Sequence, residues 1–288
     1  MPTPTEHLKA HRDAGRRFEA GGIESFVREE GTGEPVLCLH GVPTSSFLYR
    51  KVVPALAERG LRGVALDLPG LGLADRPKGF DYSWTGLGRW TVEAVDALGL
   101  DAFHLVVHDI GGPVGFEVAA AMPERVRTLT VLNTIGRIDG FRKPWTMAPF
   151  AVPRLGRLWL ASMLPFLFVR LMYLQGVADK RQSPPEELLV HLGLLGLRDG
   201  GEAFLEIMRS FEPTADKQAL YYGVLGDARY PKQLIWGERD PALRLEVHAP
   251  PLLQAAGLSE GIRLPAKHFP QEDQAPAIAA QVAALAGA

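Results

Sequence analysis

The stretch VVHDIGGP, residues 106–113, places the carboxylate of Asp109 between an apolar run and a pair of glycines. The run FHLVV before it offers no polar face and predicts a fully buried strand. The residues after it, GPVGFEVAAAM, are typical of a helix. Small residues on either side of Asp109 would allow a sharp strand-to-helix turn that points its side chain into a pocket. The alternative interpretation is that Asp109 only caps the helix that follows.

The composition indicates a globular protein whose partner is small and carries little charge. The 288 residues are 47% hydrophobic and 22% charged, and the formal net charge is -2. A chain of this length can bury a substantial core. The charge balance offers no bulk attraction to nucleic acid or to an anionic membrane. We therefore expect a small hydrophobic substrate and water as partners, with no nucleic acid and no membrane.

Three local features indicate the compartment and the cofactor class. The N-terminal residues MPTPTEHLKAHRDAGRR lack the apolar core of a signal peptide, so we expect a cytoplasmic protein. The longest uncharged apolar run, residues 158–169, contains Pro165 and is shorter than the roughly 20 residues that cross a bilayer. It predicts an interior or lid segment. Cys38 is the single cysteine, and no Cys/His cluster is present, so we expect no disulfide, no metal ion and no cofactor.

The order of the predicted elements is typical of a mainly parallel sheet covered by helices. IESFVREE alternates in period two and predicts an edge strand. Buried strands are predicted at PVLCLHG, GVALDLP, FHLVVHD and TLTVLN, and again at KQLIWGERDP and GIRLP. Between about residues 136 and 226 the pattern is helical only. We therefore predict a core made of residues 1–136 and 229–288, with residues 137–228 as an inserted helical lid.

Polar residues follow four of these strands, in LHGVPTSS, VHDIGG, WGERDPAL and PAKHFPQED. The carboxyl ends of parallel strands meet at one edge of a sheet, where ligands gather. His268 lies after the last strand and is the candidate base, and Asp240 is the candidate partner of its imidazole. Asp139 is the alternative acid, although before Gly140 it also fits a turn. The N–H groups of Val42 and Ile110 are candidate backbone donors to an oxyanion.

Four segments resemble the haloalkane dehalogenases and, more widely, the aspartate-nucleophile branch of the α/β-hydrolases that includes the epoxide hydrolases. They are HGVPTSSFLYRKVVPAL, VVHDIGGPVGFE, LIWGERDPAL and KHFPQEDQAP. The resemblance implies the α/β-hydrolase fold, with a mostly parallel eight-stranded sheet flanked by helices and a helical cap after strand 6. It also implies that Asp109 attacks an sp3 carbon and that water activated by His268 hydrolyses the resulting ester. The order Asp109, Asp240, His268 matches the family order. We expect a monomer or a homodimer.

The resemblance is incomplete at the leaving group. Dehalogenases usually carry tryptophan after the nucleophile and often asparagine after the HG pair, whereas this chain has Ile110 and Val42, which offer no side-chain donor. An anion that leaves into an apolar pocket without donors would cost several kcal/mol. Candidate donors are the lid residues Tyr173, Tyr221, Tyr222, Trp145 and Trp159. Haloalkane dehalogenation is the leading prediction, epoxide hydrolysis to a vicinal diol is the alternative, and non-catalytic binding of a small ligand is the third.

Overall fold

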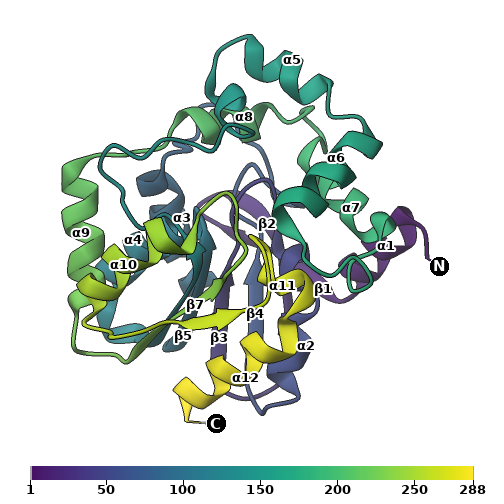
Figure 1. Ribbon diagram of the computed structural model, residues 1–288. Helices are drawn as coiled ribbons and strands as arrows, with labels where there is room; N and C mark the ends of the chain where they lie inside the picture. The colour runs from purple at the N-terminus through teal and green to yellow at the C-terminus, as the bar shows by residue number, and fades with distance from the viewer. Residues whose placement is uncertain (1, 288) are drawn as a thin grey trace.

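A computed structural model describes residues 2–287 of the chain, and a twisted sheet runs through its middle (Figure 1). The strand order is β1-β2-β4-β3-β5-β6-β7-β8. β1 and β2 pair antiparallel with their neighbours, and all pairs from β4 to β8 are parallel. The predicted eight-stranded, mostly parallel sheet is confirmed. The strands are β1 Gly15–Ala20, β2 Ile23–Glu30, β3 Pro35–Leu39, β4 Arg62–Leu66, β5 Phe103–Asp109, β6 Val126–Thr134, β7 Lys232–Gly237 and β8 Ile262–Leu264.

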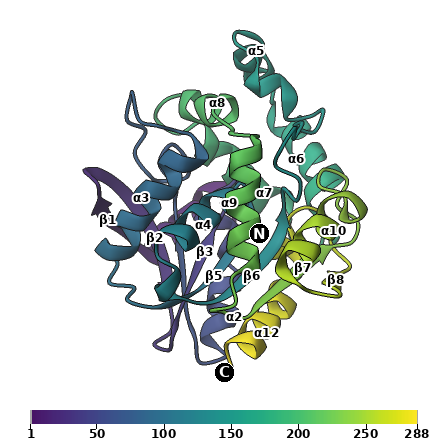
Figure 2. The same ribbon diagram turned by 90° about the vertical axis from the view of Figure 1, so that its left-hand side faces the viewer.

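Helices cover both faces of this sheet (Figures 1 and 2). One layer holds α3, α4, α9 and α10, and the other holds α2 and α12. The core helices are α1 Pro4–Asp13, α2 Val52–Ala57, α3 Trp84–Ala97, α4 Gly111–Ala121, α10 Leu245–Ala256, α11 Pro270–Asp273 and α12 Ala275–Ala286. Short turns are η1 Ser46–Tyr49 and η2 Pro123–Arg125. All seven residues of β5 are buried, because helices cover this central strand on both sides.

The edge of the sheet differs from the prediction. IESFVREE forms β2, which is the second strand and not the edge, because Gly15–Ala20 pairs outside it as β1. The sequence prediction missed β1. Its residues GRRFEA bury only Phe18 and Ala20, so the strand carries too few apolar residues for its pattern to be recognised.

The residues between β6 and β7, 135–231, form what we call the inserted segment. Its elements are η3 Ala148–Ala151, α5 Leu155–Ala161, α6 Pro165–Leu171, η4 Met172–Gly176, α7 Pro185–Leu195, α8 Glu202–Arg209 and α9 Ala215–Gly226. As predicted, this described stretch contains helices and no strand. Helices α5 to α8 lie above the sheet, whereas α9 packs against α4 and α10 and so flanks it (Figures 1 and 2).

A buried ion cluster joins the inserted segment to the core. Glu272 of α11 is fully buried, and its two carboxylate oxygens accept hydrogen bonds from Arg50 at 2.8 and 2.6 Å. His191 of α7 and the hydroxyl of Ser183 donate to the same carboxylate at 3.0 and 2.7 Å. Glu187 also pairs with Arg50. Burial alone would raise the pKa of Glu272, but the Arg50 charge and these hydrogen bonds hold it well below its usual range.

We expect Glu272→Gln to lower the free energy of unfolding by about 3–5 kcal/mol, because it leaves Arg50 buried without its main partner. Urea denaturation measures the change. Lys9→Gln, which breaks the exposed Lys9–Asp13 pair, is the control and should cost under ~1 kcal/mol.

The pH dependence of the same variant is a further check on this cluster. Because the pKa of Glu272 is lower in the folded state, its ionised form stabilises the protein at pH values above the unfolded-state pKa. This stabilisation is lost as the pH falls through the folded-state pKa. The parent should therefore lose stability steeply in acid, whereas Glu272→Gln should lose less. An equal loss in both proteins would contradict the role of Glu272.

Candidate active site

The turn between β5 and α4 holds Asp109 in a conformation that L-residues rarely adopt. Its φ is 51°, in the left-handed region. Two glycines make room for this bend. A Cβ on Gly41 would lie 2.2 Å from the Asp109 Oδ2, and a Cβ on Gly111 would lie 2.4 Å from the carbonyl oxygen of Leu39. The turn therefore excludes side chains at both positions and fixes where the carboxylate points.

Buried donors surround the Asp109 carboxylate, which is only 9% exposed as a residue. The N–H of Val42 donates to Oδ2 at 2.8 Å, and Oδ1 lies 3.8 Å from the Nε2 of His268. Burial raises the pKa of Asp109, and the His268 charge and the N–H groups of Val42 and Ile110 oppose that rise. The structure thus brings Asp109, His268 and both expected backbone donors together.

His268 and Asp240 form a direct pair. His268 lies between β8 and α11, and its Nδ1 is 2.8 Å from the Oδ2 of Asp240, which follows β7. Burial alone would lower the pKa of His268, but the charges of Asp240 and Asp109 and the hydrogen bond to Asp240 outweigh it and raise the pKa above its usual value. Asp240 stays charged because burial, which raises its pKa, is outweighed by His268 and several hydrogen bonds. The pair can therefore stabilise a cationic imidazole.

Asn133 is a buried residue of this site that the sequence analysis missed. It lies near the end of β6 with a φ of 21°. Its Nδ2 donates to the Oδ2 of Asp240 at 2.8 Å, and its Oδ1 accepts from the N–H of Gly237 at 2.8 Å. Asn133 therefore locks the loop that carries Asp240. A polar residue at the end of the apolar run TLTVLN was the available signal, and it is the same signal that identified Asp109.

Two further buried histidines hold the backbone of the site. The Nδ1 of His40 donates to the carbonyl of Gly41 at 2.9 Å, and its Nε2 accepts from the N–H of Leu68 at 3.1 Å. The Nε2 of His108 donates to the carbonyl of His268 at 2.7 Å. Burial lowers the pKa of both side chains, to about 3 for His108, so they are neutral at pH 7. Their hydrogen bonds hold the turns in position.

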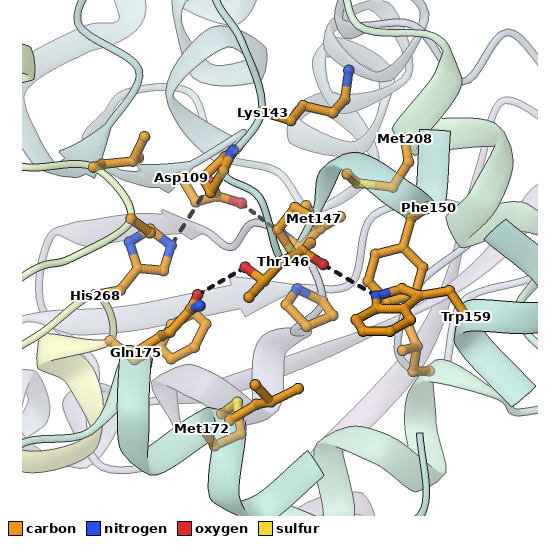
Figure 3. A pocket seen from close by; sticks show the side chains of 18 of the residues that line it. Asp109, Lys143, Thr146, Met147, Phe150, Trp159, Met172, Gln175, Met208 and His268 are labelled. Carbon is orange, nitrogen blue, oxygen red and sulfur yellow. Dashed lines mark hydrogen bonds and ion pairs between the residues drawn. The ribbon is translucent and has the colours of Figure 1, made fainter. Parts of the chain in front are cut away.

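A cavity of about 110 Å³ lies over Asp109 and His268 (Figure 3). Its walls are mainly apolar and come largely from the inserted segment. They include Phe150 of η3, Phe168 of α6, Met172 of η4 and Met208 of α8. A cavity of ~150 Å³ lined by apolar side chains can hold a benzene-sized molecule. At about 110 Å³ the cavity over Asp109 is smaller than that, so it suits only a small hydrophobic ligand.

The cavity also has a few polar groups in its wall. The Thr146 hydroxyl donates to the Oε1 of Gln175 at 3.0 Å, and the carbonyl of Gln175 accepts from the N–H of His268 at 3.2 Å. Within residues 2–287 the Nε2 of Gln175 makes no hydrogen bond, so its N–H groups are available to a ligand. The indole of Trp159 already donates to the Thr146 carbonyl at 3.2 Å. Lys143 lies over the ring of Phe211, 4.0 Å from its centroid.

Gln175 is thus a second residue that the sequence analysis missed. It lies two positions after Tyr173 in LMYLQGVADK, but a glutamine in an apolar helical segment gives no sign of which side faces a cavity. Only the packing of η4 against the His268 loop places its amide beside the imidazole (Figure 3).

The structure places the other predicted donors outside the cavity wall. The three hydroxyl groups donate elsewhere: Tyr173 to the carbonyl of Ser183, Tyr221 to the carboxylate of Glu117, and Tyr222 to the carbonyl of Gly136. Trp145 is largely exposed to solvent. Asp139, the alternative acid, is exposed in a turn, its N–H donates to the Oε1 of Gln218, and it makes no contact with His268 among the described hydrogen bonds and ion pairs.

Comparisons with known proteins identify the family to which the chain belongs. Residues 34–190 match the model of the alpha/beta hydrolase fold family. The chain is 32% identical to "Haloalkane dehalogenase 2" of Mycobacterium tuberculosis over 276 residues, 93% of each chain. The solved haloalkane dehalogenase DbeA from Bradyrhizobium elkani is 24% identical, with a TM-score of 0.77 over 95% of this chain and 98% of its own. An epoxide hydrolase from Vigna radiata is 21% identical, with a TM-score of 0.74 over 93% and 95%.

The two solved structures support the fold, and the dehalogenase sequence extends the match over nearly the whole chain. Asp109, Asp240 and His268 occur here in the chain order that the family resemblance implies, and the structure brings their side chains together. The chain belongs to the α/β-hydrolase family, as an enzyme of the branch that includes the haloalkane dehalogenases and the epoxide hydrolases.

Proposed function

We propose that the protein hydrolyses a small halogenated hydrocarbon through a covalent ester on Asp109. The observation that carries this proposal is the carboxylate itself, which is buried under an apolar cavity with one oxygen held by the Val42 N–H and the other facing His268. The chain's identity to a curated haloalkane dehalogenase supports the same reaction.

In the first step the Oδ1 of Asp109 attacks the carbon that bears the halogen. A C–O bond forms, the carbon–halogen bond breaks, and the halide leaves with the bonding electrons. The apolar cavity favours this step because it removes the water that would otherwise solvate and weaken the nucleophile. The product is a neutral alkyl ester of Asp109.

In the second step His268 takes a proton from water, which attacks the ester carbonyl of Asp109. The Oδ2 that already accepts the Val42 N–H becomes the oxyanion, and the Ile110 N–H is its second donor. Asp240 stabilises the imidazolium that forms. As the bond between the carbonyl carbon and the alcohol oxygen breaks, the imidazolium of His268 gives its proton to that oxygen and the alcohol leaves. The carboxyl group of Asp109 then releases the second water proton to solvent, which restores the carboxylate. An ester has a carbonyl that water can attack, whereas the ether that serine would form has none.

The cavity wall favours a halide leaving group over an epoxide. A halide leaves as an anion and needs only hydrogen-bond donors, which the free Nε2 of Gln175 can supply. Epoxide opening needs a proton for the alkoxide, and among the described residues no tyrosine lines the cavity. Epoxide hydrolysis is the second candidate, because Lys143 is among the residues that line the cavity and burial lowers its pKa, which makes its ammonium group a stronger acid.

We expect His268→Gln to accumulate the ester, because alkylation of Asp109 needs no base whereas hydrolysis does. Turnover of a bromoalkane should fall roughly 10²–10⁴-fold. Intact mass spectrometry should show one added alkyl group, on the peptide that contains Asp109. Asp109→Asn is the control and should show neither adduct nor turnover. An unmodified protein with full turnover would falsify the covalent mechanism.

We expect Gln175→Ala to slow alkylation by a bromoalkane roughly 10–100-fold, since a hydrogen bond to a charged group contributes about 1.5–3 kcal/mol. The backbone carbonyl that holds His268 is retained in this variant. Single-turnover halide release measures the rate. Gln218→Ala, at a residue outside the cavity wall, is the matched control. An unchanged rate in Gln175→Ala would assign the leaving group to another donor.

We expect Asp240→Asn to lower the rate of ester hydrolysis and also to lower the pH below which hydrolysis stops. His268 must be neutral to act as the base, and the Asp240 charge raises its pKa. Without that charge the neutral form persists to lower pH, while the maximal rate falls roughly 10²–10⁴-fold. Single-turnover rates against pH test this. Asp139→Asn should match the parent in both respects, and a loss there instead would identify Asp139 as the acid.

A further inference from the structure

The outer side of α5 and of the α5–α6 connection is unusually apolar. We call Val152, Leu155, Leu158, Leu164 and Phe166 the apolar ridge; all are exposed, Leu158 to 70% and Phe166 to 73%. Seven of the nine large exposed hydrophobic residues in the described chain lie between residues 145 and 174. Such a concentration of exposed hydrophobic residues in one segment indicates an interaction surface.

The charge of this stretch is of one sign. Residues 140–178 contain Arg142, Lys143, Arg154, Arg157 and Arg170 and no aspartate or glutamate, although the whole chain carries a net charge of -2. Arg157 pairs with an exposed glutamate of α8, whereas the described structure shows no ion pair for Arg154 or Arg170. The surface that the ridge presents is therefore apolar and basic.

The ridge stands clear of the rest of the molecule. Figures 1 and 2 both show α5 at the top of the molecule, projecting away from the sheet. A second cavity of about 280 Å³ separates part of α5 from α7 and α8, between Leu160, Leu192 and Leu205. On their inner side α5 and α6 contribute Trp159 and Phe168 to the active-site cavity. The same two helices thus have one face toward the catalytic groups and one toward the outside.

We propose that the apolar ridge binds the surface of an anionic lipid bilayer. Helices that lie in a bilayer interface combine an apolar face with lysine and arginine, and acidic headgroups attract the basic residues. No single described helix is long and apolar enough to span a bilayer; α5 and the Pro165–Gly176 helix pass that test together but are bent by 100°. Since their inner residues line the cavity, the pair lies on the membrane and does not enter it as a span.

The charges favour lipid over a second copy of the chain. A symmetric dimer through the ridge would bring the basic residues of two copies against each other with no acidic residue of the stretch between them. An anionic bilayer pairs with the same residues. Binding here would overturn the expectation of no membrane partner, because that expectation rested on the bulk charge of -2 and not on this local surface.

Membrane binding would also place the active site near its substrate. Small hydrophobic molecules partition into lipid, and the helices that carry the ridge also form the wall of the cavity. This consequence rests on the proposed function, whereas the binding itself does not. We therefore expect the apparent KM for a lipophilic bromoalkane, expressed as its total concentration, to fall when anionic vesicles are present.

Vesicle flotation tests the binding without any substrate. The protein should float with phosphatidylcholine–phosphatidylglycerol vesicles, much less with pure phosphatidylcholine, and less at high salt. Leu158→Asp combined with Phe166→Asp should abolish flotation. Arg170→Gln should weaken the affinity roughly fivefold, the equivalent of ~1 kcal/mol for one basic residue. Val247→Asp, at an exposed apolar residue of α10, is the matched control and should float like the parent.

Two further measurements on the Leu158→Asp, Phe166→Asp variant, called the ridge variant, distinguish a loss of membrane binding from a loss of folding or catalysis. Thermal unfolding and turnover of a water-soluble bromoalkane should be unchanged in the ridge variant, because neither Leu158 nor Phe166 lines the cavity. Failure of the parent to float, or flotation of the ridge variant, overturns the proposal while leaving the proposed catalysis intact. Light scattering measures the oligomeric state. A dimer of the parent that the ridge variant does not form, together with no flotation of the parent, would assign the surface to a second copy and would also overturn the proposal.

Discussion

The carboxylate of Asp109 is held at a left-handed bend, away from water, and the surrounding structure depends on that constraint. The bend requires glycine at positions 41 and 111, since a Cβ at either would overlap the turn. Burial makes the charged carboxylate costly, and the Val42 and Ile110 N–H groups and His268 offset that cost. The same donors can later stabilise the oxyanion, so one arrangement serves the resting carboxylate and the proposed ester.

Burial has opposite consequences for the histidines of the site. Burial lowers the pKa of His40 and His108, and the charges of Asp67 near His40 and of Asp240 near His108 oppose this too weakly to reverse it. Both histidines therefore act as fixed hydrogen-bonding groups. His268 is also buried, but it faces Asp240 and Asp109, whose charges raise its pKa. The hydrogen bond from Asn133 and the N–H groups of the β7 loop keep Asp240 ionised and oriented. The network therefore reserves proton exchange for one imidazole.

The inserted segment contributes to the active-site cavity on its inner side and to the exposed surface on its outer side. Its inner side chains give the cavity its apolar wall, its Gln175 backbone holds the His268 loop, and its α7 joins the core through the buried Glu272 cluster. We infer that this segment acts as a cap over Asp109. Its outer ridge is apolar and basic, so access to the cavity and contact with a membrane can be set by the same pair of helices.

The sequence by itself determined the strands of the central sheet, the strand–turn–helix at Asp109 and the strand ends that carry Asp240 and His268. These depend on local patterns, namely apolar runs, glycine at a tight turn and the shared edge of parallel strands. The sequence analysis did not predict the edge strand β1, because only two of its residues are buried. Tertiary structure alone decided that Gln175 enters the cavity while Tyr173, Tyr221 and Tyr222 bond elsewhere. Short helices can turn any face inward, and only packing against the core selects which one does.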